Sequence, residues 1–150
     1  MRSFLVAIST LMLAALPWSA GADKPGPRGL VVIVNPGSGV AKLERGDAVN
    51  IFMGRYRKLP SGIVAFPIDI GDRSPEREQF YRQLVGKELA EVDSYWARLV
   101  FSGQTSPPLQ VPDARTAVEL VAGNRAAIAY VDRSVVDDRV KIVLELEQQR

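Results

Sequence analysis

The stretch IVAFPIDIGDRSPERE, residues 63–78, decides the fold, because a strand pattern changes into a helix pattern within it. Residues 63–70 are largely apolar and predict a buried strand, the second of the chain. Ser74-Pro75-Glu76 is typical of a helix start, with serine as N-cap, proline at the first helical position and an acid in the first turn. The junction therefore predicts a strand that leads through a short loop into a helix.

The helix that begins at this junction is expected to turn Phe80, Leu84 and Val85 inward and to end at Gly86. Working outward, we predict further strands at residues 30–34, 126–131 and 140–146, and further helices at 44–53, 88–101 and 113–123. Residues 103–112 contain three prolines, which exclude both a helix and a central strand there. The order of elements predicts an α/β domain with a mixed sheet flanked by helices and at least one parallel strand pair.

The first residues have the pattern of an export signal. Arg2 supplies a positive start, an apolar run extends to Leu16, and Ala20-Gly21-Ala22 fits a signal peptidase site. The run is shorter than the roughly 20 residues that span a bilayer. We predict a cleavable signal peptide at 1–22, a flexible lead-in at 23–29, one domain at 30–146 and a tail at 147–150, and hence a periplasmic location.

Composition excludes several functions. The chain has neither cysteine nor histidine, so it has no thiolate nucleophile, no serine–histidine catalysis and no ordinary zinc site. The 19 basic and 17 acidic residues nearly balance, which argues against a nucleic-acid partner. We expect no catalytic residues, no cofactor and no metal. Asp132, Asp137 and Asp138 lack the alternate spacing of a calcium loop and are interpreted as a polar turn.

The loop from Gly71 to Arg77 is the main candidate site. Ligands of open α/β sheets gather where strands end, and a helix N-terminus there favours an anion. Ser74 can donate its hydroxyl, Arg77 can grip an oxyanion, and Asp72 can accept from a protonated one. Arg73 is a secondary candidate. The alternative is structural: Arg77 pairs with Asp72 or Glu76, and Pro75 removes one N–H donor.

The loop Asn35-Pro36-Gly37-Ser38-Gly39 also follows a predicted strand, which makes Ser38 and Gly39 secondary candidates. It lacks the spacing of a phosphate loop or of a dinucleotide site. Its resemblance to the opening of diacylglycerol-kinase-like lipid kinases fails, because their later glycine–aspartate motif is missing. A connecting turn is therefore the preferred interpretation.

Several segments together resemble type II periplasmic phosphate-binding proteins, the substrate-binding proteins of phosphate ABC transporters, in a short single-lobe form. The matching segments are Val49 to Arg55 (VNIFMGR), Glu76 to Tyr81, Tyr95 to Gly103 (YWARLVFSG), Pro107-Pro108 and Ala126 to Val131 (AAIAYV). The resemblance implies one lobe of that fold. In the family's phosphate loop, R-x-D-x-S-G-T, the aspartate and serine fall on Asp72 and Ser74. The arginine, glycine and threonine fall instead on Ile70, Pro75 and Glu76.

The resemblance implies an exported module that binds phosphate or a similar oxyanion weakly, because a single lobe forms only half of the family's site. It also implies a periplasmic or membrane protein as partner. The alternative is a protein-interaction or sensory domain that keeps the lobe fold without a ligand.

Overall fold

The computed structural model describes residues 29–71 and 74–147. The elements in chain order are β1 (Leu30–Val34), η1 (Pro36–Ser38), α1 (Arg45–Phe52), β2 (Phe66–Ile70), α2 (Pro75–Val85), α3 (Leu89–Phe101), β3 (Leu109–Val111), α4 (Ala114–Gly123), β4 (Ala127–Asp132), η2 (Arg133–Val135) and β5 (Lys141–Glu145). The predicted signal peptide, most of the lead-in and most of the tail lie outside the described residues. Within these residues, no helix has the length and apolar character needed to cross a bilayer.

The five strands form one mixed sheet in the order β3-β2-β4-β1-β5. β2 runs parallel to both β3 and β4, while β1 runs antiparallel to β4 and β5. The α/β class and the mixed sheet are thus confirmed. Because β1 runs against β4, its end at Val34 pairs with Ile128, near the start of β4. The loop after β1 and the loop after β2 therefore lie at opposite ends of the strands.

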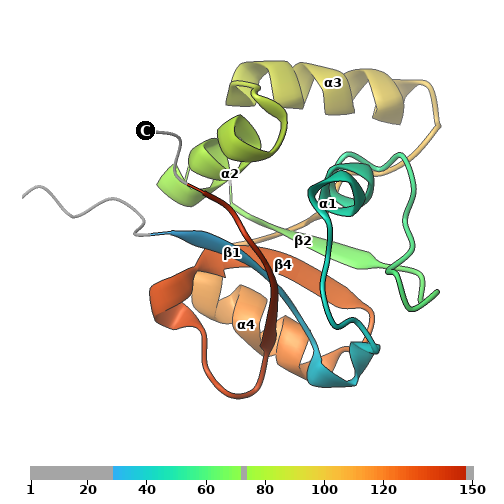
Figure 1. The fold of residues 1–150 in the computed structure, drawn as a ribbon. Coiled ribbons are helices and arrows are strands. Elements are labelled where there is room, and N and C mark those ends of the chain that lie inside the picture. The colour runs from blue at the N-terminus through green and yellow to red at the C-terminus, as the bar shows by residue number, and fades with distance from the viewer. Residues whose placement is uncertain (1–28, 72–73, 148–150) are drawn as a thin grey trace, which may run out of the picture.

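Helices cover both faces of the sheet. α1, α2 and α3 lie on one side and α4 lies on the other, with α3 outermost (Figure 1). All residues of β1 and β4 are buried, as the continuous apolar runs in their sequences predict. The sheet is therefore the centre of a three-layer domain whose core extends to both sides.

Aromatic side chains fill the core between the sheet and α2. Phe80 stacks on Tyr130 of β4, with ring centroids 3.7 Å apart and planes 9° apart. Phe52 of α1 meets the Phe80 ring edge-on at 4.8 Å. Trp96 fits the three-or-four-residue spacing of the apolar face of α3, which predicts a core residue, and it is only 5% exposed. These contacts fix α1 and α2 against the sheet.

The structure corrects three details of the sequence prediction. The second strand begins at Phe66 rather than residue 63, because residues 57–65 form a loop closed by the bridge between Lys58 and Val64. Leu109–Val111 forms a short strand that the sequence did not predict; it sits at the edge of the sheet, where the prolines before it are tolerated. Val100 fits the three-or-four-residue spacing of the apolar face of α3, which predicts burial, yet it is 54% exposed.

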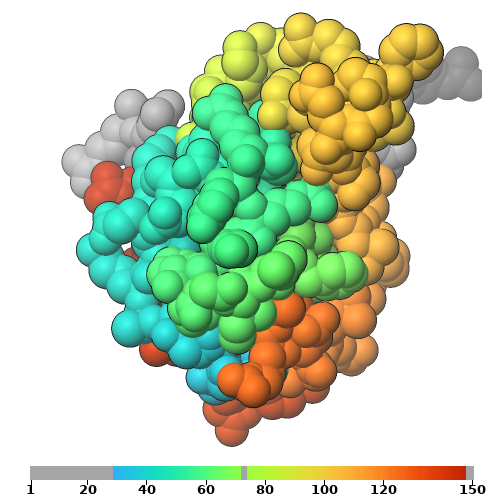
Figure 2. Space-filling view, turned by 90° about the vertical axis from the view of Figure 1, so that its right-hand side faces the viewer, coloured from blue at the N-terminus to red at the C-terminus, as the bar shows by residue number. Residues whose placement is uncertain are grey.

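The face turned toward the viewer in Figure 2 is built mainly from one connection. The segment from α1 to β2, cyan to green, covers its middle, with α3 above and the end of α4 below. This connection contributes Tyr56 and Val64, both more than half exposed, to the surface. It is also the segment that carries the basic residues Arg55, Arg57 and Lys58.

Candidate functional site

The candidate site lies where the parallel strands end. Gly71, directly after β2, donates its N–H to the Val111 carbonyl at the end of β3 over 2.7 Å. A side chain at Gly71 would come within 3.1 Å of that oxygen, so glycine permits this close approach. The carboxyl ends of β2 and β3 are thereby joined, and α2 and α4 begin just after them. The carboxyl ends of the strands are where α/β sheets bind ligands.

The start of α2 is closed by its own residues. The Ser74 Oγ accepts a hydrogen bond from the Arg77 N–H at 3.0 Å, as expected for an N-cap. Pro75, at the first helical position, has no N–H to offer. The Ser74 hydroxyl proton and the Glu76 N–H remain, with no acceptor found among the residues that the structure describes. The helix start therefore offers fewer donors than its dipole alone suggests.

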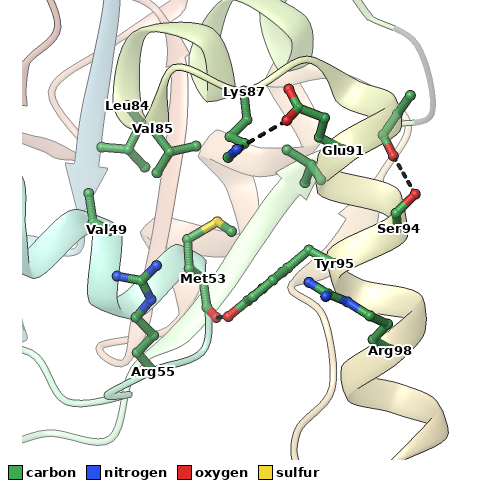
Figure 3. A pocket seen from close by; sticks show the side chains of 12 residues that line it. Val49, Met53, Arg55, Leu84, Val85, Lys87, Glu91, Ser94, Tyr95 and Arg98 are labelled. Atoms are coloured by element: carbon green, nitrogen blue, oxygen red, sulfur yellow. Dashed lines mark hydrogen bonds and ion pairs between the residues drawn. The ribbon is translucent and has the colours of Figure 1, made fainter.

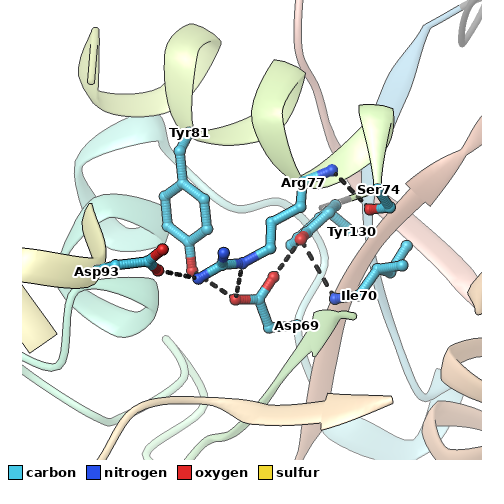
Figure 4. Close-up of polar contacts among 7 residues, drawn as sticks. All are labelled: Asp69, Ile70, Ser74, Arg77, Tyr81, Asp93 and Tyr130. Atoms are coloured by element: carbon cyan, nitrogen blue, oxygen red, sulfur yellow. Dashed lines mark hydrogen bonds and ion pairs between the residues drawn. The ribbon is translucent and has the colours of Figure 1, made fainter. Parts of the chain in front are cut away.

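The side chain of Arg77 points into the protein, away from the carboxyl ends of the strands, and is only 3% exposed (Figure 4). Its Nε donates to the Asp69 Oδ2 at 2.9 Å, and its Nη2 donates to the Asp93 Oδ1 at 2.9 Å. Asp69 is buried in β2, whereas Asp93 on α3 is 57% exposed. The guanidinium thus forms an ion pair with a buried carboxylate and a second with a surface carboxylate.

Two tyrosines complete the surroundings of Asp69. The Tyr81 hydroxyl donates to the Asp69 Oδ2 at 3.1 Å, and the Tyr130 hydroxyl donates to the Oδ1. The Tyr130 oxygen accepts in turn from the Ile70 N–H at 3.2 Å. We call Arg77, Asp69, Tyr81, Tyr130 and Asp93 the Arg77 cluster. In it the Asp69 carboxylate accepts hydrogen bonds from one guanidinium and two hydroxyls, donors of the kind that also bind oxyanions.

Burial dominates the electrostatics of the Arg77 cluster. It raises the pKa of Asp69 above its ordinary value, although the hydrogen bond from Tyr130 and the charge of Arg77 oppose the shift. Burial also lowers the pKa of Arg77, but the charges of Asp69 and Asp93 and the hydrogen bonds to them together outweigh burial and raise that pKa. Burial and the Asp69 charge raise the pKa of both tyrosines well above their usual range. Arg77 and both hydroxyls therefore stay protonated at neutral pH.

The structure places the predicted site residues as follows. Ser74 lies just past the carboxyl end of β2 and caps α2. Arg77 lies beneath it with its guanidinium turned to Asp69. Asp72 and Arg73 lie outside the described residues. Ser38 and Gly39 follow β1 and lie at the opposite end of the sheet's strands, so they share no site with Ser74. Ser38 is buried, and its Oγ accepts from the Val40 N–H.

Asp69 was missed by the sequence reasoning, although the sequence carries a signal for it. The residue stands between Ile68 and Ile70 in a run that predicts a strand buried on both faces. A carboxylate in such a run needs a buried partner, because an unpaired buried charge is very costly. A search for that partner among nearby cations would have included Arg77, eight residues later, which the structure shows to be the partner.

The aspartates of the β4–β5 connection are engaged locally. Asp132 accepts from the Ser134 N–H and hydroxyl at 2.9 and 2.6 Å, and Asp137 pairs with Arg139 at 2.8 Å. Over residues 29–71 and 74–147, no three acidic side chains come together in a way that would hold a metal ion. Beside this connection, a pocket of about 360 Å³ separates it from α4.

No protein-family model matches the chain, and no curated protein matches its sequence. Solved structures do match its fold. An ABC-type phosphate transport receptor from Vibrio cholerae matches with a TM-score of 0.61 and 19% identity over 77% of this chain and 45% of its own. A putative phosphate ABC transporter substrate-binding protein from Clostridium perfringens, with bound phosphate, matches with a TM-score of 0.60 and 24% identity over 77% and 44%.

A possible phosphate binding protein from Planctomyces limnophilus matches less well, with a TM-score of 0.54 and 12% identity over 77% of this chain and 40% of its own. All three proteins are described as receptors or binding proteins. The chain has the fold of one lobe of a phosphate ABC transporter substrate-binding protein, and it spans less than half the length of these proteins.

Proposed function

We propose that this chain is an exported module that binds phosphate or a similar oxyanion weakly and acts in uptake beside an ABC transporter, without catalysing a reaction. The observation that carries this proposal is the fold, which matches one lobe of a protein described with phosphate bound. The start of α2 follows the carboxyl end of β2, and this position supports the proposal because such sheets bind anions there.

The anion would be bound at the α2 start rather than by the Arg77 guanidinium. Ser74 can donate its hydroxyl proton, and Glu76 can donate its backbone N–H, while the helix dipole favours negative charge. Arg77 could contact the anion only after leaving Asp69, and a broken buried ion pair is costly. Asp72 and Arg73 remain candidates of the same loop. With so few donors, the affinity of the chain alone is expected to be weak.

The proposed site is one half of a cleft. The matched segment covers less than half of the phosphate-binding proteins, so a second lobe would be needed to complete the cleft. A second copy of this chain, or a periplasmic or membrane protein, can supply it. Closing the cleft would exclude water and strengthen each hydrogen bond to the anion.

Calorimetry and thermal melting with phosphate and sulfate test this proposal on a matched pair of variants. Ser74→Asp keeps an effective N-cap but places a negative charge at the α2 start. Ser61→Asp adds the same charge beside Gly39, at the opposite end of the sheet's strands. We expect millimolar phosphate to raise the melting temperature of the wild type and of Ser61→Asp, but not of Ser74→Asp. A wild-type protein that shows neither heat nor stabilisation would overturn oxyanion binding by this chain.

The alternative function, a protein-interaction or sensory domain without a ligand, is favoured by one observation. The Asp69 carboxylate already engages the Arg77 guanidinium and both tyrosine hydroxyls, so these donors are not available to an oxyanion. Such a domain should ignore phosphate and retain a defined protein partner from a periplasmic extract. Capture of the same partner by wild type and Ser74→Asp alike, without any phosphate response, would select this alternative.

A further inference from the structure

A groove of about 830 Å³ lies between α1, the end of α2 and α3 (Figure 3). It reaches Val85, the last residue of α2, and so lies at the end of that helix opposite Ser74. Its apolar lining includes the partly exposed Val49 and Val85 and, behind them, the buried Met53, Leu84 and Val92. A pocket of this size and lining is typical of sites for small organic molecules.

Two arginines border the groove from opposite walls. Arg55 follows α1, Arg98 belongs to α3, and both guanidinium groups turn toward the space between these helices (Figure 3). Both residues are exposed, and neither forms an ion pair with any residue in 29–71 or 74–147. The third cation at the rim, Lys87, is already paired with Glu91 at 3.0 Å. The groove therefore carries two positive charges that lack a counter-charge among these residues.

The walls of the groove are held in place without a ligand. The Tyr95 hydroxyl on α3 donates to the Met53 carbonyl at the end of α1 over 2.7 Å. Next to it, Gly54 packs directly on the Trp96 ring, where an added Cβ would lie 2.7 Å from the Cη2 atom. α1 and α3 are thus fixed relative to each other at the point where the arginines face the groove. A ligand would pay little to order this site.

We propose that this groove binds an organic anion with an apolar body, such as a medium- or long-chain carboxylate or alkyl phosphate. The acid group would lie between Arg55 and Arg98, and the hydrocarbon would lie against Val49 and Val85, which are partly exposed. Charge complementarity identifies this occupant, because a neutral hydrocarbon leaves both guanidinium groups unpaired. A small inorganic anion leaves the apolar lining exposed to water. The site is separate from the proposed oxyanion site and does not depend on it.

Isothermal titration of the full chain with octanoate, decanoate and decanol, all below the concentrations at which they aggregate, tests the proposal. Each buried methylene contributes about 0.8 kcal/mol, so affinity should rise about fourfold per methylene from octanoate to decanoate. Decanol and inorganic phosphate should bind the groove far more weakly than decanoate. Equal binding of decanol would overturn the proposal, and so would a lack of decanoate binding at millimolar concentration.

Variants at the two arginines locate the site. Arg55→Ala and Arg98→Ala should each weaken decanoate binding about tenfold, the size expected for one charge-assisted hydrogen bond. The double reversal Arg55→Glu with Arg98→Glu should abolish it. Arg115→Ala removes an exposed arginine of α4, on the other face of the sheet, and should change nothing. Decanoate affinity that survives the double reversal would show that the anion binds elsewhere, and would overturn the proposal.

Flotation with phosphatidylglycerol vesicles tells which source supplies the anion. Association that the double reversal abolishes would mean that the groove takes the headgroup of a membrane lipid. Decanoate binding without vesicle association would mean that it takes a free molecule. Both results support the same chemistry at the groove. Phosphate titration of the same variants keeps this test distinct from that of the oxyanion site.

Discussion

At the residue scale, the Arg77 cluster depends on the pairing of one buried cation with one buried carboxylate. Replacing Arg77 by methionine keeps most of the volume but leaves Asp69 with only its two tyrosine hydroxyls. Loss of one partner of a buried ion pair is strongly destabilising. We expect Arg77→Met to lower the free energy of unfolding by about 3 kcal/mol, measured by urea denaturation.

Asp93 provides the control for this prediction. It pairs with the same guanidinium, but its side chain is 57% exposed, and exposed pairs contribute little. Asp93→Asn should lower the unfolding free energy by less than about 1 kcal/mol. If the two variants were equally destabilised, the buried pair with Asp69 would not be the main contribution of Arg77.

The raised pKa of Asp69 makes stability depend on pH in a definite direction. Between its ordinary value of 3.8 and its raised value, the folded state holds the proton while the unfolded state has lost it. The folded state thus binds more protons, so stability falls as pH rises through this interval. We expect the difference in unfolding free energy between wild type and Asp69→Asn to decrease from pH 4 upward. A difference that grows with pH would contradict the direction of the shift.

The sequence predicted single residues well where the signal is local. Ser74 is the N-cap of α2, as the Ser-Pro-Glu order indicates, because capping involves only residues within one turn. Arg77 was singled out as an anion-binding side chain, and the structure pairs it with an anion from within the chain. That partner lies in β2, and whether Asp69 or a ligand meets Arg77 depends on how α2 packs on the sheet, which local patterns do not determine.

At the element scale, the end of α1 requires glycine for two reasons. Gly54 has φ +68°, a left-handed conformation, and its Cα lies against the Trp96 ring of α3. Gly54→Ala adds backbone strain of about 1 kcal/mol and a steric clash of similar or larger size. We expect a loss of about 3 kcal/mol by urea denaturation.

Gly86, after α2, separates the two contributions. Its φ of +65° is nearly the same, but an added Cβ would meet no atom within 4 Å. Gly86→Ala should therefore cost only the backbone strain, about 1 kcal/mol. Equal losses at both positions would mean that Trp96 moves aside without cost, and that α1 and α3 are not held as the groove requires.

Elements with a strong internal pattern were predicted close to their observed bounds, as β1 at residues 30–34 illustrates. The edge strand at Leu109–Val111 was missed because its three residues form a strand only through pairing with β2. Val100 was placed on the buried face because it fits the helical spacing, but nothing covers the end of α3 among the described residues. In both cases tertiary contacts override the local pattern.

At the scale of the whole molecule, the α/β order of elements was sufficient to predict a mixed sheet, because short connections allow few topologies. Charge balance argued against a nucleic-acid partner, and the absence of histidine and cysteine excluded catalysis by those two residue types. What these signals leave open is whether the lobe acts alone. The start of α2 lies at the carboxyl ends of β2, β3 and β4. In a single lobe this position is at the surface, where water competes with any ligand.

Oligomeric state therefore provides the last test. If a second copy completes the oxyanion site, phosphate binds the dimer better than the monomer, and linkage requires phosphate to promote dimerisation. We expect sedimentation velocity to show a shift from monomer toward dimer in millimolar phosphate, but not in chloride of equal ionic strength. Ser74→Asp should stay monomeric, whereas Ser61→Asp should behave as wild type. Phosphate binding by calorimetry with no change in sedimentation would instead show that one lobe binds the anion unaided.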